Sequence, residues 1–142
     1  MFNLIRNLKY KRIHSKRKKA KGHCGLKIVY VASKLAGNID ENISDTKKYC
    51  RFVYNKGFMP VASHIMYPAM GFDDNNEDER NKCCTYGLYL LSFCDELHCF
   101  IVDELSGGMK QEIKVAKKLR IPIKYFRVSE DIIYECSSPR CD

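Results

Sequence analysis

The stretch Leu26-Lys27-Ile28-Val29-Tyr30-Val31-Ala32 decides the fold. It is short and rich in branched apolar residues, and a polar, glycine-containing turn at 33–38 follows it. Together these features are typical of a buried strand. The segments on its carboxyl side show what kind of sheet the strand belongs to.

Apolar residues downstream alternate between helical and strand patterns. Ile43, Thr46, Cys50 and Val53 recur at helical spacing, and Gly57 is placed to end that helix. Further strands are predicted at 58–62, 97–102 and 121–126, further helices at 77–94 and 106–119, and a long loop at 63–76. Because strands and helices alternate, the sequence predicts an α/β domain at 26–126 with a parallel sheet and helices on both faces. A short tail at 127–142 has no predicted element.

The composition is that of one globular domain. The chain has 142 residues, of which 45% are hydrophobic and 30% are charged. These values exclude a disordered chain, a large barrel and a two-domain nucleotide enzyme. No apolar run approaches the ~20 residues of a membrane-spanning helix.

The net charge of +8 arises at the N-terminus. Residues 1–22 hold nine of the 25 lysines and arginines and no acid, which leaves 16 basic and 17 acidic residues elsewhere. The charge of the folded part therefore does not favour nucleic-acid binding. Residues 1–25 are expected to form a basic, disordered arm. The alternative is an arm that contacts nucleic acid or an anionic membrane, because Phe2, Ile5 and Leu8 lie at helical spacing beside the cations.

Eight cysteines raise the alternatives of disulfides, a metal site and reduced thiols. The chain contains no CxxC motif and its four histidines are scattered, so a zinc site is not expected. Several cysteines fall at apolar positions, where a thiol packs as a small hydrophobic group. The N-terminus lacks the apolar run of a signal peptide. We therefore expect a cytoplasmic protein with reduced thiols and with no metal or other cofactor.

In an open parallel sheet, ligands bind beyond the carboxyl ends of the strands. Three loops are predicted there, at 33–38, 63–72 and 103–108. Ser106 can cap the helix that follows the third loop, and Gly107 and Gly108 let a ligand approach free backbone N–H groups. A simple capping turn with two glycines is the alternative.

Glu112 places a candidate catalytic carboxylate in the same helix. Met109, Ile113 and Ala116 define the inward face of the helix at 106–119. On a helical wheel with about 100° per residue, Glu112 lies about 60° from Met109 and belongs to the same face. A carboxylate on a sheet-facing surface is costly unless it is paired or functional. A local capping interaction is the alternative.

The remaining candidates lie in the predicted loops. His64 and Tyr67 follow the second strand, where a base or sugar would be held, and for His64 a structural role in the loop is the alternative. Ser33 and Gly37 are placed either to contact a sugar or phosphate or to form a turn. Asp103 is placed either to accept a hydrogen bond from a ligand hydroxyl group or to cap the next loop. The candidate ligand-binding residues are therefore Ser33, Gly37, His64, Tyr67, Asp103, Ser106, Gly107, Gly108 and Met109.

Several motifs together resemble the nucleoside 2-deoxyribosyltransferase-like superfamily, and most of all its small phage- and prophage-associated branches. They are Tyr30-Val31-Ala32-Ser33, Gly37, Cys94-Asp95-Glu96-Leu97 and Ser106-x-Gly108-x-x-x-Glu112, within residues 26–126. The resemblance implies a flavodoxin-like (Rossmann-like) three-layer fold with a short, mostly parallel sheet of four to five strands. It also implies cleavage or transfer at the N-glycosidic bond of a deoxynucleoside or its 5′-monophosphate.

By the same resemblance, Glu112 is the nucleophile that attacks the anomeric carbon and forms a glycosyl-enzyme, which a second base or water then resolves. Ser106 matches the nucleotide hydrolase branch, where this serine helps to bind the 5′-phosphate. The chain departs from the pattern at Gly87, where the family has an aspartate that protonates the leaving base. Asp73 or Asp74 is the candidate replacement, and a nucleotide-binding protein without catalysis is the alternative function.

A second subunit is also expected. Tyr86, Tyr89, Leu90 and Phe93 give the helix at 77–94 a second apolar face, which predicts a homo-oligomer. The resemblance implies that a neighbouring subunit completes the pocket, with residues 127–142 as the candidate segment.

Overall fold

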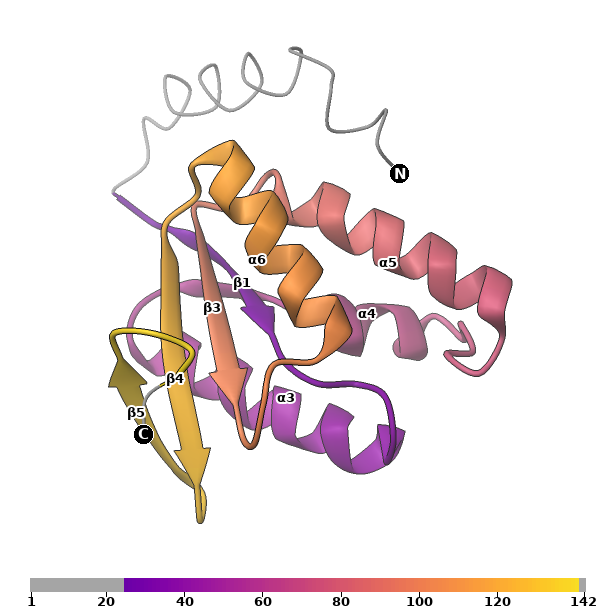
Figure 1. Ribbon diagram of the computed structural model, residues 1–142, viewed down its shortest axis with the longest axis horizontal. Coiled ribbons are helices and arrows are strands. Elements are labelled where there is room, and N and C mark those ends of the chain that lie inside the picture. The colour runs from indigo at the N-terminus through magenta and orange to yellow at the C-terminus, as the bar shows by residue number, and fades with distance from the viewer. Residues whose placement is uncertain (1–24, 141–142) are drawn as a thin grey trace.

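The structure of the chain, a computed structural model, describes residues 25–140 and contains one sheet. Its strands are β1 (Ile28–Ala32), β2 (Met59–Val61), β3 (Glu96–Ile101), β4 (Ile123–Ser129) and β5 (Ile132–Cys136). They lie in the order β2-β1-β3-β4-β5, with the first four parallel and β5 antiparallel at the edge (Figure 1). This is the strand order of flavodoxin-like folds, and it confirms the predicted α/β fold and the mostly parallel sheet.

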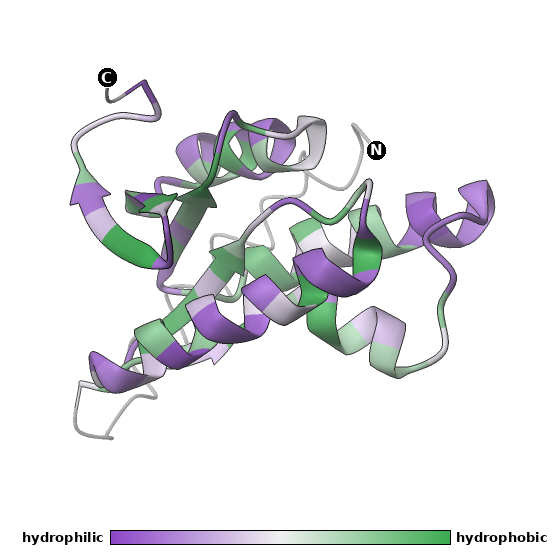
Figure 2. Cartoon of the chain, turned by 90° about the horizontal axis from the view of Figure 1, so that it is seen from below, coloured by the Kyte–Doolittle hydropathy of each residue, from purple (hydrophilic) through white to green (hydrophobic). Residues whose placement is uncertain are grey.

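Helices cover both faces of the sheet. They are α3 (Ile39–Asn55), α4 (Ser63–Ala69), α5 (Glu77–Leu91) and α6 (Gly107–Leu119). Helix α3 packs on one face and helices α5 and α6 on the other, whereas α4 contacts both α3 and α5 (Figure 1). Figure 2 shows that the first turns of α5 are strongly hydrophilic, in keeping with the acidic residues that follow Asn76.

The alternation of side chains along β1 divides the core in two. Val29 and Val31 point toward α3 and pack in one cluster, whereas Tyr30 and Ala32 point toward α5 and α6 in the other. All four are essentially fully buried. Tyr30 is therefore a polar side chain in the centre of an otherwise apolar strand, directed at the face that also holds α6.

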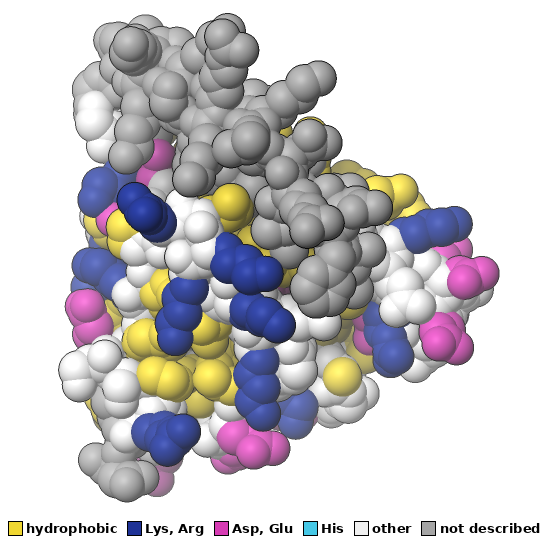
Figure 3. All heavy atoms as spheres, turned by 45° about the horizontal axis from the view of Figure 1, so that its top comes forward, with side chains coloured by type: hydrophobic (Ala, Val, Ile, Leu, Met, Phe, Trp, Pro, Cys, Tyr) yellow, Lys and Arg dark blue, Asp and Glu magenta, His cyan; other side chains and the backbone are white. Residues whose placement is uncertain are grey.

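Helix α6 has the orientation that its sequence predicts. Met109, Ile113 and Ala116 are buried together with Glu112. The opposite face is basic and lies in solvent, and Figure 3 shows lysine and arginine side chains on this side of the molecule. The exposed lysines of α6 are Lys110, Lys114, Lys117 and Lys118.

Two local predictions differ from the structure. The loop predicted at 63–76 is wrong in its first half, because 63–69 form α4, with Pro68 in its last turn. A helix of seven residues is too short to show a periodic pattern, and a proline argues against a helix when the sequence alone is considered.

The tail also contains structure. Strand β4 continues to Ser129 and pairs with β5 through a hairpin. Glu130 and Asp131, which connect the two strands, both have positive φ, at 50° and 64°. Positive φ at both central residues is the geometry of a type I′ turn, which usually contains Asn or Gly, so the residue types did not indicate it.

The expected basic arm lies outside the described residues, apart from Gly25. Within residues 25–140, no helix is both long enough and apolar enough to cross a membrane.

Candidate functional site

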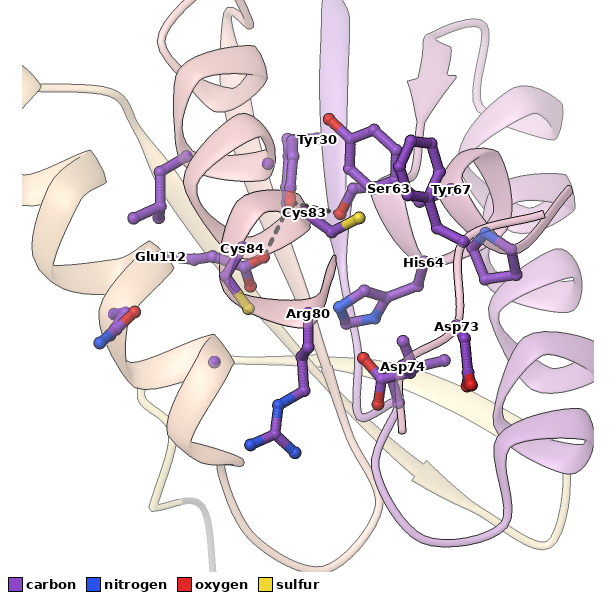
Figure 4. A pocket seen from close by; sticks show the side chains of 17 residues that line it. Tyr30, Ser63, His64, Tyr67, Asp73, Asp74, Arg80, Cys83, Cys84 and Glu112 are labelled. Carbon is purple, nitrogen blue, oxygen red and sulfur yellow. Dashed lines mark hydrogen bonds between the residues drawn. The ribbon is translucent and has the colours of Figure 1, made fainter. Parts of the chain in front are cut away.

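A cavity of about 60 Å³ lies on the α5–α6 side of the sheet, between β1 and the helices α4, α5 and α6 (Figure 4). Its walls combine apolar, acidic and hydroxyl side chains with one arginine and two thiols. The polar lining residues include Tyr30, Ser63, His64, Tyr67, Asp73, Asp74, Arg80, Cys83, Cys84, Gln111 and Glu112.

Glu112 is the most deeply placed carboxylate of this cavity, with 6% of its surface exposed. Ser106 caps α6 by accepting a hydrogen bond from the backbone N–H of Met109 at 3.2 Å, which confirms the predicted cap. The helix that starts there carries Glu112 inward after about one turn. Its Oε1 accepts a hydrogen bond from the Tyr30 hydroxyl at 2.8 Å, whereas Oε2 has no hydrogen-bond partner among residues 25–140.

Burial raises the pKa of Glu112 to about 8, against the opposing effect of the hydrogen bond from Tyr30. The side chain is therefore mostly protonated at neutral pH in the unliganded protein. One oxygen of this carboxyl group is fixed by a hydrogen bond and the other faces a cavity. Such an arrangement favours a role in catalysis or ligand binding over a role in stabilising the fold.

Tyr30 links Glu112 to α4. Its hydroxyl lies 2.8 Å from the Ser63 hydroxyl as well as 2.8 Å from Glu112, and Figure 4 shows both contacts as dashed lines. Burial raises the pKa of Tyr30 well above its usual value, and the nearby Glu112 raises it further. The phenol therefore keeps its proton and remains a donor. Neither Tyr30 nor Ser63 was among the predicted site residues.

Gly87 of α5 packs directly against this pair of hydroxyl groups. A Cβ atom at Gly87 would lie 3.1 Å from the Tyr30 oxygen and 3.3 Å from the Ser63 oxygen. The space beside the position at which the resemblance implies an aspartate is thus narrowed by the hydroxyl groups of β1 and α4.

His64 and Asp74 form the opposite side of the cavity (Figure 4). Burial lowers the pKa of His64, and the charge of Asp74 and a backbone hydrogen bond at Ser33 only partly oppose this effect. The imidazole is therefore neutral at pH 7, and its Nδ1 atom has no hydrogen-bond partner in the described part of the chain. Arg80 adds a cation to the same wall.

A second cavity of about 440 Å³ lies between the start of α3 and the start of α6. It is lined by four of the predicted residues, namely Ser33, Asp103, Ser106 and Met109. The Ser33 hydroxyl is hydrogen-bonded to Thr46 at 2.6 Å, and Met109 belongs to the core. The first turn of α6 therefore separates two cavities and lines both.

The predicted residues are thus divided among three places. Glu112, His64, Tyr67 and Gly108 meet in the first cavity. Gly37 and Gly107 line neither cavity, and Gly37 has a φ of 101°, which a turn requires. Within residues 25–140, no three His, Cys, Asp or Glu side chains are grouped to hold a metal ion.

Comparison with known proteins gives a family and a fold. Residues 27–126 match the family described as Domain of unknown function (DUF7768). The chain belongs to this family. No curated protein matches this DUF7768 member in sequence.

The fold of this DUF7768 chain is similar to that of a 2-deoxyribosyltransferase from Bacillus psychrosaccharolyticus, with a TM-score of 0.55. The two chains are 16% identical, over 75% of this chain and 77% of that one. That enzyme is described as a biocatalyst for the synthesis of nucleosides. At this level of identity the likeness concerns the fold alone.

The raised pKa of Glu112 makes folding stability depend on pH. The folded state binds the proton more tightly than the unfolded state, so this contribution is complete below pH 4.5 and is lost as pH rises toward 8. We expect Glu112→Gln to match the wild type near pH 5 and to be more stable at pH 8, with the difference growing by at most about 1.4 kcal/mol per pH unit. Urea unfolding from pH 5 to 8.5 measures this difference. The exposed control Glu104→Gln should run parallel to the wild type, and a parallel curve for Glu112→Gln would contradict the assignment.

Gly87→Ala tests the close approach of α5 to the two hydroxyl groups. Alanine in place of a helical glycine normally stabilises a protein by about 1 kcal/mol. Here the new methyl group must displace Tyr30 or Ser63, so we expect no gain or a loss. Gly107→Ala, whose Cβ meets no atom within 4 Å, is the matched control and should be neutral or stabilising. Equal gains in thermal unfolding for both variants would show that the contact at Gly87 does not constrain the site.

Proposed function

We propose that this protein cleaves the N-glycosidic bond of a 2-deoxynucleoside, with Glu112 as the nucleophile. The observation that carries the proposal is the carboxyl group of Glu112, which has Oε1 fixed by Tyr30 and Oε2 without a partner beside a cavity. Similarity of fold to a 2-deoxyribosyltransferase supports this choice of chemistry. The Ser106-x-Gly108-x-x-x-Glu112 motif supports it independently.

The reaction follows from the two oxygens of Glu112. Oε2 attacks the anomeric carbon as the bond to the base breaks, and the electron pair of that bond leaves with the base, which takes up a proton. Water or a second base then attacks the same carbon, and the ester to Glu112 breaks to restore the carboxylate. Because Glu112 must be ionised to attack, the fraction of active protein increases with pH up to about 8.

Asp74 and His64 are the groups that we assign to the leaving base. Gly87 carries no side chain, so the polar groups that hold the base lie on another wall of the cavity, and the base takes its proton from water. Asp74 is half-buried and acts on His64 through its charge, and the Nδ1 atom of His64 is available to a ligand. His64 follows Ser63 in α4 and lies between the Tyr30–Ser63 contact and Asp74 (Figure 4).

The cavity must enlarge to hold a nucleoside. Its volume of about 60 Å³ is room for about two water molecules. Phe72 and Asp73 are exposed and form part of its wall after Gly71, which has a φ of 87°. We propose that this turn moves outward when the ligand binds. We also propose a homo-oligomer that covers the exposed Tyr86 and Tyr89 of α5.

Catalysis is tested by the release of free base from a panel of deoxynucleosides. We expect base release by the wild type, faster at pH 8 than at pH 7, and a loss of about a thousandfold or more in Glu112→Gln. Glu77→Gln, an exposed glutamate of α5 that lines neither cavity, is the control and should retain activity. Activity that survives in Glu112→Gln would contradict the mechanism.

A binding protein without turnover is the second candidate, because Gly87 lacks the carboxylate that the resemblance implies. Thermal stabilisation by a nucleoside, with no base release from any member of the panel, would favour this candidate over the enzyme.

The charges around Ser106 indicate whether the substrate carries a 5′-phosphate. The second cavity is lined by Glu41, Asp45, Asp103 and Glu104 and by one cation, Lys34. Lys48 pairs with Asp45 at 3.1 Å, which leaves an excess of acids. Although Ser106 alone favours a phosphorylated ligand, these carboxylates favour an uncharged 5′-hydroxyl over a phosphate dianion.

We therefore expect a deoxynucleoside to have a kcat/KM about tenfold or more above that of its 5′-monophosphate at low ionic strength. The Asp103→Asn/Glu104→Gln double variant should reduce this ratio, because it removes two of the negative charges. Steady-state kinetics with both substrates provide the measurement. A preference for the monophosphate in the wild type would overturn this assignment.

A further inference from the structure

Ser63 lies at the far end of a buried chain of hydrogen bonds that ends on Glu112. The Ser63 hydroxyl is 2.8 Å from the Tyr30 oxygen, and the Tyr30 oxygen is 2.8 Å from Glu112 Oε1. The exposed fractions of the three residues are 5%, 1% and 6%. The three side chains come from α4, β1 and α6, which are far apart in the sequence.

We propose that Ser63 is a positioning residue, which orients the Tyr30 hydroxyl so that Tyr30 in turn orients Glu112 for attack. The proposal rests on the proposed function for its catalytic consequence. Its structural content, a coupling from Ser63 to Glu112 through Tyr30, does not depend on turnover.

The direction of the chain follows from counting protons. A phenol has one proton, and Tyr30 donates it to Glu112. The Tyr30 oxygen is then the acceptor in its contact with Ser63, so Ser63 is the donor. A donated hydrogen bond at the phenol oxygen limits rotation of the hydroxyl and strengthens the bond that it makes.

The position of Ser63 in α4 fits this role. The N-cap of α4 is Ala62, which makes no capping hydrogen bond through its side chain. Ser63 begins the helix, and its hydroxyl is directed at Tyr30. The absence of a Cβ at Gly87 leaves the space that the two hydroxyl groups occupy.

Other groups that face Glu112 do not compete with Tyr30 for this role. Besides Tyr30 of β1, the titratable groups that face Glu112 are Cys84 of α5 and Cys99 of β3. Burial raises the pKa of each, so all three are neutral at pH 7. Tyr30 is the group whose hydrogen bond lowers the pKa of Glu112.

The test is a double-mutant cycle read out on Glu112 itself. The variants are Ser63→Ala, Tyr30→Phe and the double variant, and the pKa of Glu112 is measured by carboxyl ¹³C NMR titration. We expect this pKa to rise in both single variants, because the carboxylate loses all or part of the hydrogen bond that stabilises it. In the double variant it should equal that of Tyr30→Phe, because Ser63 has no route to Glu112 without the phenol.

The same variants give a kinetic readout at pH 7. We expect kcat/KM to fall about tenfold in Tyr30→Phe and about threefold to fivefold in Ser63→Ala, with no further loss in the double variant. Ser44→Ala, an exposed serine of α3, is the control and should match the wild type. Ser63→Cys keeps the size of the side chain with a weaker donor, and it replaces Ser63→Ala in the cycle if the alanine variant does not fold.

Two results would overturn the proposal. One is a pKa of Glu112 that is unchanged in both Ser63→Ala and Ser63→Cys. The other is additive losses in the cycle, which would mean that Ser63 acts on the ligand directly from the cavity wall. Because the NMR titration needs no substrate, a coupled pKa without any base release would support the role of Ser63 and contradict the proposed reaction.

Discussion

The structure depends at its centre on one costly feature, a carboxyl group buried between α6 and the sheet. Glu112 has a single hydrogen bond for two oxygens, and burial raises its pKa to about 8. An ionised carboxylate in such surroundings costs several kcal/mol, and the protein avoids that cost at neutral pH by keeping the proton. A neutral side chain of similar size would pack here without this cost. Packing alone therefore does not account for a glutamate at this position.

A second buried glutamate makes the contrast clear. Glu96 has both oxygens occupied, one by Lys27 at 2.6 Å and the other by His98 at 2.8 Å. Burial alone would raise its pKa, but the hydrogen bonds from Lys27 and His98 outweigh burial and lower it. Glu96 forms a structural ion pair at the start of β3 in which both carboxylate oxygens are hydrogen-bonded. Glu112 has a hydrogen bond to only one of its oxygens within the described residues, and it lies beside a cavity. The same residue type thus takes two roles because its partners differ.

The sequence was sufficient to predict whatever depends on periodicity. The apolar run of β1 and the spacing of Met109, Ile113 and Ala116 predicted a parallel α/β sheet and an inward-facing Glu112, and both are present. Helix α4 could not be predicted in this way, because seven residues ending near a proline show no periodic pattern. Tyr30 and Ser63 were missed because their contact joins positions 33 residues apart, which only the tertiary structure brings together. A phenol in the middle of a buried strand was nevertheless a signal, since such a hydroxyl group needs a partner.

The space beside Gly87 is limited by the two hydroxyl groups of the chain of hydrogen bonds that ends on Glu112. A Cβ atom there would lie 3.1 Å from the Tyr30 oxygen and 3.3 Å from the Ser63 oxygen, so a side chain at this position fits only if the hydroxyl pair shifts by a few tenths of an ångström. With glycine at this position, both hydroxyl groups take part in the chain of hydrogen bonds that ends on Glu112, and Gly87 itself presents no polar side chain to the cavity. In the proposed reaction, the polar groups that meet the base therefore belong to another part of the cavity wall, where Asp74 and the Nδ1 atom of His64 are placed. Gly87, Tyr30 and Ser63 therefore act as one unit, because a side chain at Gly87 would press on both hydroxyl groups and so on the hydrogen bond that holds Glu112.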